Sequence, residues 1–241
     1  EAGHGGYGHR GGLGRGRRHR RYLPPGGHRR RHGLYGRAGS GSLPRRGRPR
    51  QGPQSDLAQK HPDASIRDAS QKRVDLLTPI VKAWSTEQAI EIASLGVQVH
   101  GGMGYIEETG AAQHLRDARI TTIYEGTTGI QAGDLLGRKI IRDEGQEAKS
   151  LFKEMQASVS DLKRSPSEEL QTIGHALEKA IAALDQAVDW LLQMHTKNPQ
   201  ATLAGAYPLL KCFGIVSGGW LLAKSALIAS HRLQKNSGDR F

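Results

Sequence analysis

The stretch SPSEELQTIGHALEKAIAALDQAVDWL, residues 165–191, decides the fold class of this 241-residue chain. Its apolar side chains recur in two rows of heptad type: Leu170, Leu177, Leu184 and Leu191, and then Ile173, Ile181 and Val188. Residues at this spacing share one face of a helix, which is buried against other helices. Ser165–Glu168 adds a cap, a proline and a reciprocal glutamate, so a bundle helix is predicted to begin there.

Working outward, other segments show the same helical periodicity. Two further buried faces are expected, one made of Leu151, Met155, Val159 and Leu162, and one of Val74, Leu77, Val81 and Trp84. Pro79 is expected to begin or kink the second of these helices. The stretch AIEIASLGVQVHGG, residues 89–102, ends in glycines that predict a helix stop. Since no strand pattern follows residue 55, the fold class is predicted to be all-α, a helical bundle.

The last helix is predicted over residues 201–233. Gly214 and Gly218 lie four residues apart on one side of it, where they let a neighbouring backbone or a bulky Trp approach. Its apolar run, residues 212–223, is shorter than the ~20 residues of a membrane span, so a buried helix and no span are predicted. Cys212 is the sole cysteine, which excludes an intramolecular disulfide and favours a reducing, cytoplasmic setting. Within the apolar run its thiol is predicted to be inert.

The first 50 residues differ from the rest in composition. They hold fourteen Arg and one Glu, a local net charge of +13 against +12 for the whole chain. Because this Gly-, Arg-, His- and Pro-rich stretch has little to bury, residues 1–54 are predicted to be disordered. Two interpretations stay open. Arginine-rich segments bind nucleic acid, with Tyr7, Tyr22 and Tyr35 as stacking partners; alternatively, the composition is that of a GC-rich gene translated out of frame.

Several familiar catalytic patterns do not fit this sequence. His100 and His114 have no Cys or carboxylate partner at metal-ligand spacing, so no metal site is predicted. No GxSxG elbow is present. The glycines of QVHGGMGY, residues 98–105, follow a helix with GGxG spacing, which argues against a Rossmann phosphate loop. Such glycines can still let a ligand approach the backbone.

The stretch IYEGTTGIQ, residues 123–131, places one carboxylate, Glu125, between an aromatic ring and a glycine. A short helix is expected before it, within ETGAAQHLRDARI. A second helix is expected after it, because Thr128 and Gln131 fit a capping box. The apolar face of that helix is predicted to be Ile130, Leu135, Leu136, Ile140 and Ile141. Glu125 is therefore predicted to lie just outside a helix N-terminus.

The blocks QVHGGMGY, LRDARI and IYEGTTGIQ follow one another within 34 residues. This combination resembles the C-terminal helical domain of the acyl-CoA dehydrogenase family of flavoproteins. The resemblance runs from about residue 65 to the end of the chain. Beyond residue 145, AYPLLKCFG and GGWLLAKSAL resemble a longer subgroup with an additional C-terminal helical domain. The resemblance implies that residues 55–145 form the dehydrogenase helical domain and that residues 146–241 form the additional domain.

The resemblance also implies the chemistry of the site. In this family a Glu of the YEGT-like motif removes the α-proton of an acyl-CoA thioester while the β-hydrogen leaves as hydride to FAD, and Glu125 occupies that position. Gly126 corresponds to a substrate-binding residue. Cofactor contacts are implied for two groups, Thr127, Thr128 and Gly129, and then Gln98, Val99, His100, Gly101 and Gly102. Many shorter members have Gln where this chain has Gly129. The second group corresponds to a stretch that touches the flavin dinucleotide of a neighbouring subunit.

Partners follow from the same resemblance: an acyl-CoA substrate, further copies of the chain in a homo-oligomer, and an electron-transferring flavoprotein. The family also needs an N-terminal helical domain and a middle β-domain, which the basic first 50 residues do not encode, and the chain stops before an expected final helix. The chain is therefore expected to be a C-terminal fragment without activity on its own. The alternative function is that of a non-catalytic helical interaction module with a basic nucleic-acid-binding arm.

Overall fold

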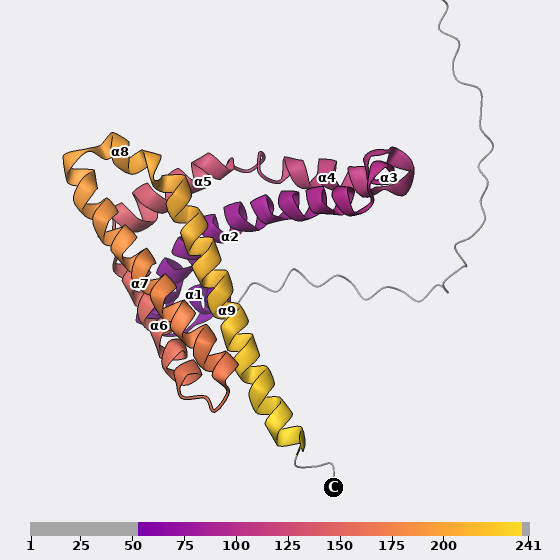
Figure 1. The fold of residues 1–241 in the computed structure, drawn as a ribbon. Coiled ribbons are helices and arrows are strands. Elements are labelled where there is room, and N and C mark those ends of the chain that lie inside the picture. The colour runs from indigo at the N-terminus through magenta and orange to yellow at the C-terminus, as the bar shows by residue number, and fades with distance from the viewer. Residues whose placement is uncertain (1–52, 238–241) are drawn as a thin grey trace, which may run out of the picture. The chain divides into compact units, whose positions relative to one another are not determined.

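The computed structural model describes residues 53–237, and within that range the regular elements are all helices. In chain order they are α1 (Pro53–Lys60), α2 (Ala64–Val99), α3 (Gly102–Tyr105), η1 (Glu107–Thr109), α4 (Ala111–Ile120), α5 (Thr128–Asp134), η2 (Leu135–Ile141), α6 (Gln146–Lys163), α7 (Glu168–Lys197), α8 (Pro199–Ala204) and α9 (Ala206–Ser237). η1 is a 3-10 turn and η2 is a π-helix. The predicted all-α class is confirmed. Figure 1 shows α4 running back along the second half of α2.

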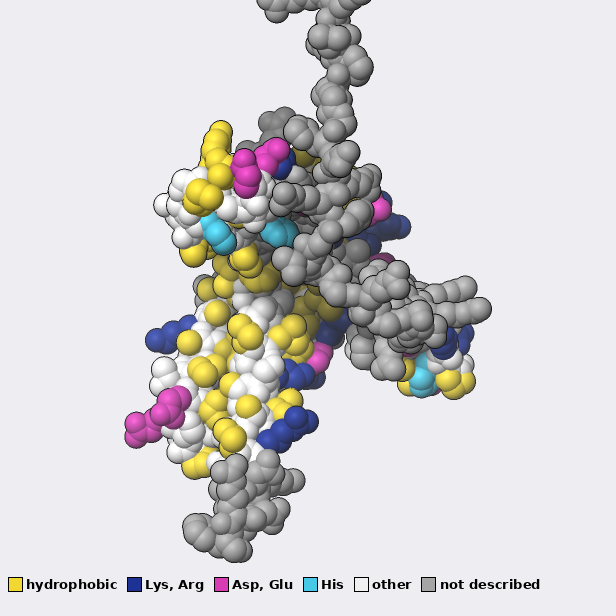
Figure 2. Space-filling view, turned by 90° about the vertical axis from the view of Figure 1, so that its right-hand side faces the viewer, with side chains coloured by type: hydrophobic (Ala, Val, Ile, Leu, Met, Phe, Trp, Pro, Cys, Tyr) yellow, Lys and Arg dark blue, Asp and Glu magenta, His cyan; other side chains and the backbone are white. Residues whose placement is uncertain are grey.

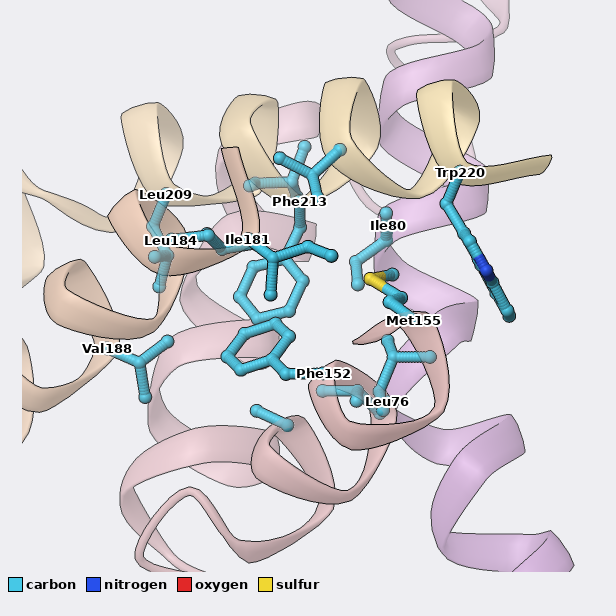
Figure 3. Packing of buried hydrophobic residues seen from close by; sticks show 14 of the residues in the cluster. Leu76, Ile80, Phe152, Met155, Ile181, Leu184, Val188, Leu209, Phe213 and Trp220 are labelled. Atoms are coloured by element: carbon cyan, nitrogen blue, oxygen red, sulfur yellow. The ribbon is translucent and has the colours of Figure 1, made fainter. Parts of the chain in front are cut away.

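One hydrophobic core joins α2, η2, α6, α7 and α9. Leu76, Met155 and Phe213 are among its fully buried side chains. Phe152 of α6 stacks on Phe213 of α9, with ring centroids 5.7 Å apart (Figure 3). Offset aromatic pairs at such separations attract each other beyond what burial alone provides. This pair therefore helps to fix α9 against α6.

The heptad prediction for α7 is confirmed for its leucine row, which is buried throughout. The second row runs through Gly174, Ile181 and Val188, whereas Ile173 is exposed. A Cβ at Gly174 would come within 3.1 Å of Leu162 Cβ on α6. The glycine thus lets α6 and α7 approach closely, which a search for apolar side chains does not detect.

α2 runs unbroken through Pro79. Of the two alternatives predicted for this proline, a helix start is therefore wrong, and a kink stays a prediction. The helix begins instead after Asp63, whose carboxylate accepts a hydrogen bond from Ser65 N at 2.7 Å. An Asp at this position satisfies one of the backbone N–H groups that the first helical turn leaves free.

The buried face of α2 differs in part from the predicted one. Leu77 and Trp84 are partly buried against the core, as predicted, whereas Val74 and Val81 are not among the residues that pack there. The side chains that enter the core are Leu76, Pro79, Ile80 and Ala83. Val74, Leu77 and Val81 line an open groove of 570 Å³ beside Lys82, and Val81 is 59% exposed. The helix therefore carries apolar residues on two faces, and its periodicity does not indicate which of them faces the core.

Trp84 of α2 lies in a notch on α9 that two glycines create. An ideal Cβ at Gly214 would lie 2.1 Å from Trp84 Cδ1, and one at Gly218 would lie 3.6 Å from Trp84 Cη2. The indole ring therefore occupies the space that a side chain at residue 214 would need. The prediction that these glycines admit a bulky Trp is confirmed.

The last helix differs from its prediction in two respects. A break at Gly205 separates the short helix α8 from α9. Only one face of α9 is buried, since Phe213 is fully buried while Cys212 is exposed and Leu222 is 72% exposed. The predicted burial of the whole apolar run, including the Cys212 thiol, is wrong. Figure 2 shows hydrophobic side chains along this outward face.

α9 is also long enough for a membrane span, contrary to the estimate from its apolar run. Residues 206–234 are long and apolar enough to cross a membrane by length and composition, and 28% of their most apolar window is buried inside the fold. The buried part, which includes Phe213 and Trp220, packs in the same core as α6 and α7. This packing accounts for part of the apolar character of the helix.

The predicted disordered segment, residues 1–54, lies outside the described residues, except that Pro53 and Gln54 begin α1. The two interpretations of that segment remain predictions. The boundary predicted after residue 145 falls at Gly145, between η2 and α6. Core residues lie on both sides of it.

The notch on α9 that holds Trp84 predicts different effects for two glycine substitutions on this helix. Gly214→Ala forces a methyl group into the ring of Trp84, and we expect it to lower the free energy of unfolding by about 1–3 kcal/mol. Gly219→Ala is the matched control, because nothing lies within 4 Å of its Cβ position. It should leave stability unchanged or raise it by up to ~1 kcal/mol through helix propensity. Urea unfolding followed by circular dichroism measures both, and equal stabilities would contradict the packing of Trp84.

Candidate active site

The loop between α4 and α5 carries Glu125. This residue has a φ of 53°, in the left-handed region that costs a residue with a side chain about 1–2 kcal/mol. Its side chain is exposed in the single chain, as are those of Ile123 and Tyr124. Backbone strain of this kind persists only where surrounding contacts hold it, and it is frequent at functional sites. The predicted catalytic residue is therefore held in an unusual conformation.

Lys82 of α2 anchors this loop. Its Nζ donates hydrogen bonds to three backbone carbonyl oxygens, those of Thr121 (3.0 Å), Tyr124 (3.0 Å) and Gly126 (2.7 Å). The ammonium also lies 5.7 Å from the centroid of the Tyr124 ring. Sequence reasoning missed Lys82, although one signal was present: no acidic residue stands three or four positions from it on the helix. A lysine without such a partner on its own helix can serve a distant acceptor.

The N-terminus of α5 is capped by Thr127, one residue earlier than the predicted capping box. Thr127 Oγ1 accepts a hydrogen bond from Ile130 N at 3.3 Å. Gln131 does not complete a capping box, because its Nε2 donates to the carbonyl oxygen of Glu125 at 3.3 Å. The buried Thr128 instead donates its hydroxyl to Glu87 Oε1 on α2, at 2.6 Å. Two polar side chains thus tie this end of α5 to α2 and to the loop.

The helix that follows also departs in part from its predicted apolar face. Leu135, Leu136 and Ile140 are fully buried as predicted, whereas Ile130 is 64% exposed. The exposed Ile130 lies in the first turn of α5, and the loop residues Ile123 and Tyr124 are exposed as well.

Gly126, the predicted substrate-binding residue, has a φ of 89°. A Cβ at this position would lie 2.9 Å from Gln131 Nε2, the group that bonds to the Glu125 carbonyl. The backbone conformation therefore favours glycine here, and a side chain would displace the Gln131 amide from its bond to the Glu125 carbonyl. Gly129 is exposed, with no side chain to contact a ligand.

The second group of predicted cofactor residues, 98–102, lies at the far end of α2. All five are exposed. Gly101 has a φ of 59°, and the buried Gly104 lets α3 fold back on the end of α2, since a Cβ there would lie 2.3 Å from Val97 O. At 1.5 Å per residue, Lys82 and Val99 are about 25 Å apart along the helix axis. The structure therefore brings residues 125–129 together and places residues 98–102 elsewhere.

The segment between residues 102 and 124 has few buried side chains. α4 packs on the second half of α2, yet none of its residues is buried. Large apolar side chains at its tip are open to solvent, among them Val99 at 85% and Tyr105 at 82% exposed. Exposed apolar surface of this extent is typical of a surface that another chain or domain covers.

The chemistry available at the loop is that of one carboxylate among backbone carbonyls and threonine hydroxyls. Within residues 53–237, no three His, Cys, Asp or Glu side chains gather as a metal site requires. A single carboxylate on a fixed loop can act as a general base toward a group that is placed against it.

Comparisons with known proteins show which family the chain resembles. Residues 63–140 match the family described as acyl-CoA dehydrogenase, C-terminal domain, and residues 151–241 match the family described as acetyl-CoA dehydrogenase C-terminal like. The chain is similar to 3-methylmercaptopropionyl-CoA dehydrogenase of Ruegeria pomeroyi, with 45% identity over 77% of this chain and 31% of the relative. It is 32% identical to the broad-specificity linear acyl-CoA dehydrogenase FadE5 of Mycobacterium tuberculosis, over 64% of this chain and 26% of the relative. The chain spans under a third of the length of these relatives.

The site geometry predicts that Gly126→Ala loosens the loop. The substitution places a side chain at a φ of 89° and pushes against Gln131 Nε2, so we expect a loss of about 1–2 kcal/mol in the free energy of unfolding. Gly133→Ala is the matched control within α5, where nothing lies within 4 Å of the added methyl. Thermal unfolding compares the two variants. If both melt alike, residue 126 does not need glycine.

Proposed function

The chain belongs to the acyl-CoA dehydrogenase family, and from that premise we propose that it supplies the general base, Glu125, for the α,β-dehydrogenation of an acyl-CoA thioester. The observation that carries the proposal is the conformation of the loop. Glu125 is held at a φ of 53° between two peptides that Lys82 anchors, and its carboxylate is exposed for contact with a ligand. A base must be placed within hydrogen-bond reach of the proton that it removes, and a fixed loop meets that need.

In the proposed mechanism each residue of the loop has a distinct task. Glu125 removes the proton α to the thioester carbonyl. Gly126 lets the backbone pass close to the substrate, because it has no side chain. The apolar surfaces of Ile123 and Tyr124 exclude water from the carboxylate once another domain covers them.

Of the three residues at the start of α5, two are suited to contact a flavin and one is less suited. A bound FAD would supply the acceptor for the β-hydrogen, which would leave as hydride. Thr127 is exposed, and although its Oγ1 accepts from Ile130 N, its hydroxyl hydrogen is available to a cofactor atom. Gly129 leaves room for close approach. Thr128 is less suited, because it is buried and its hydroxyl donates to Glu87.

Residues 98–102 are proposed to contact a flavin held by another copy of the chain. Their exposure and their distance of about 25 Å from the Glu125 loop along α2 support this arrangement. The apolar tip formed by Val99, Met103 and Tyr105 is a surface that a homo-oligomer would cover. Reoxidation by an electron-transferring flavoprotein belongs to the same proposal. A substrate like that of the Ruegeria pomeroyi relative is the first to test.

The proposal is tested in two forms of the protein. The chain alone is expected to bind no flavin and to show no dye reduction with acyl-CoA, because it spans under a third of its relatives. A chimera, in which residues 63–237 replace the matching part of the Ruegeria pomeroyi enzyme, is expected to bind FAD and be reduced by acyl-CoA. Glu125→Gln in the chimera should slow flavin reduction about 100- to 10,000-fold without loss of FAD.

Glu144→Gln is the matched control, since Glu144 is also an exposed glutamate with a positive φ of 56°. It should leave the reduction rate unchanged. Stopped-flow absorbance of the flavin measures all three rates. Flavin reduction in Glu125→Gln at the rate of the unchanged chimera would exclude Glu125 as the base.

A further inference from the structure

We infer that Lys82 is the positioning residue of this site, holding Glu125 in its left-handed conformation through the backbone on either side of it. The ammonium group has three N–H donors, and each of them meets a carbonyl oxygen of the same short loop. Two of these carbonyls belong to Tyr124 and Gly126, the residues that flank Glu125. One side chain thus fixes both peptides next to the strained residue.

The hydrogen bonds of Lys82 exclude a different task for it. Its Nζ forms no ion pair with any carboxylate among the described residues, including that of Glu125. Because all three donors are used on the backbone, the ammonium has none left for a substrate oxygen. Lys82 therefore acts on the reaction through the position of Glu125 and not by contact with the reacting atoms.

The surroundings make this role specific to Lys82. Gln131 Nε2 donates to the Glu125 carbonyl at 3.3 Å, a longer bond made by a neutral group. Hydrogen bonds from a charged donor are stronger than neutral ones. Lys82 also lies on α2 between Ile80 and Ala83, whose side chains are buried in the core, so its backbone is a rigid base for the loop.

Without the ammonium, the carbonyl groups of Tyr124 and Gly126 lose the charged donor that holds them. Glu125 can then leave the left-handed region for the more favourable right-handed or extended ones. Such a change rotates the peptide and turns the carboxylate away from its place. The inference rests on the proposed function for its catalytic consequence only; the restraint on the loop is a property of the chain itself.

The restraint is tested in the full chain by hydrogen exchange, resolved by NMR. Lys82→Met keeps an unbranched apolar stem and removes the three donors. Two loop amides report on the restraint, Tyr124 N, which donates to Ile120 O at 3.2 Å, and Thr128 N, which donates to Thr122 O at 3.3 Å. We expect both to exchange about tenfold faster or more in the variant, while the amide of Leu184 in the middle of α7 keeps its rate.

Lys72→Met is the matched control, because Lys72 lies on the same helix and, within residues 53–237, forms its ion pair with Asp68, at 2.8 Å on an exposed surface. Amide exchange at Tyr124 and Thr128 should be unchanged in Lys72→Met.

The three-bond HN–Hα coupling and the Cα chemical shift of Glu125 report on its backbone conformation. Both should change in Lys82→Met and not in Lys72→Met. Equal exchange rates and an unchanged Glu125 signal in the two variants would overturn the inference. If Lys82→Met does not fold, Lys82→Gln, which keeps two donors, is measured against the same criteria.

The catalytic consequence is tested in the chimera. Lys82→Met should lower the limiting rate of flavin reduction about 100-fold, with unchanged FAD content and a smaller change in the acyl-CoA concentration for half-saturation. Lys72→Met should match the unchanged chimera. If Glu125→Gln is slow and Lys82→Met is not, the positioning role is wrong. If Glu125→Gln has no effect, the proposed function fails, and the exchange data still decide whether Lys82 restrains the loop.

Discussion

The path of α2 through the bundle is the constraint on which the other parts of the structure depend. Leu76, Ile80 and Ala83 lie in the core, so this part of the helix has one fixed rotation about its axis. That rotation places Lys82 on the side of the loop and Trp84 on the side of α9. The bundle therefore orients the residues that hold the site, although no bundle residue takes part in the proposed chemistry.

The sequence predicted the bundle better than it predicted the site. The leucine row of α7 and the Leu151 face of α6 were confirmed, because a helix buried on one side shows a clear heptad or 3–4 spacing. The predicted face of α2 was right for Leu77 and Trp84 and wrong for Val74 and Val81, since apolar residues lie on two sides of that helix. Likewise Gly174 fills a core position that only its close contact with α6 reveals.

At the site, the role of Glu125 was predicted from its motif, but its conformation and restraint were not. The bonds from Lys82 span about 40 residues of sequence, and no local pattern encodes such a pairing. The cap residue of α5 was misplaced by one position, because Thr127 and Thr128 both offer a hydroxyl and only the contact with Glu87 distinguishes them. The cap of α7 was also misplaced, since it lies at Ser167, two positions after the predicted Ser165. Capping positions of this kind depend on tertiary neighbours as well as on residue type.

The indole of Trp84 and the two glycines of α9 have a consequence for related sequences. A larger residue at position 214 has no room while Trp84 is present, and a smaller residue at position 84 leaves an empty volume beside Gly214 and Gly218. Either change alone is unfavourable, whereas a paired exchange of volume is tolerated more easily. These positions, 130 residues apart, should therefore covary in homologues.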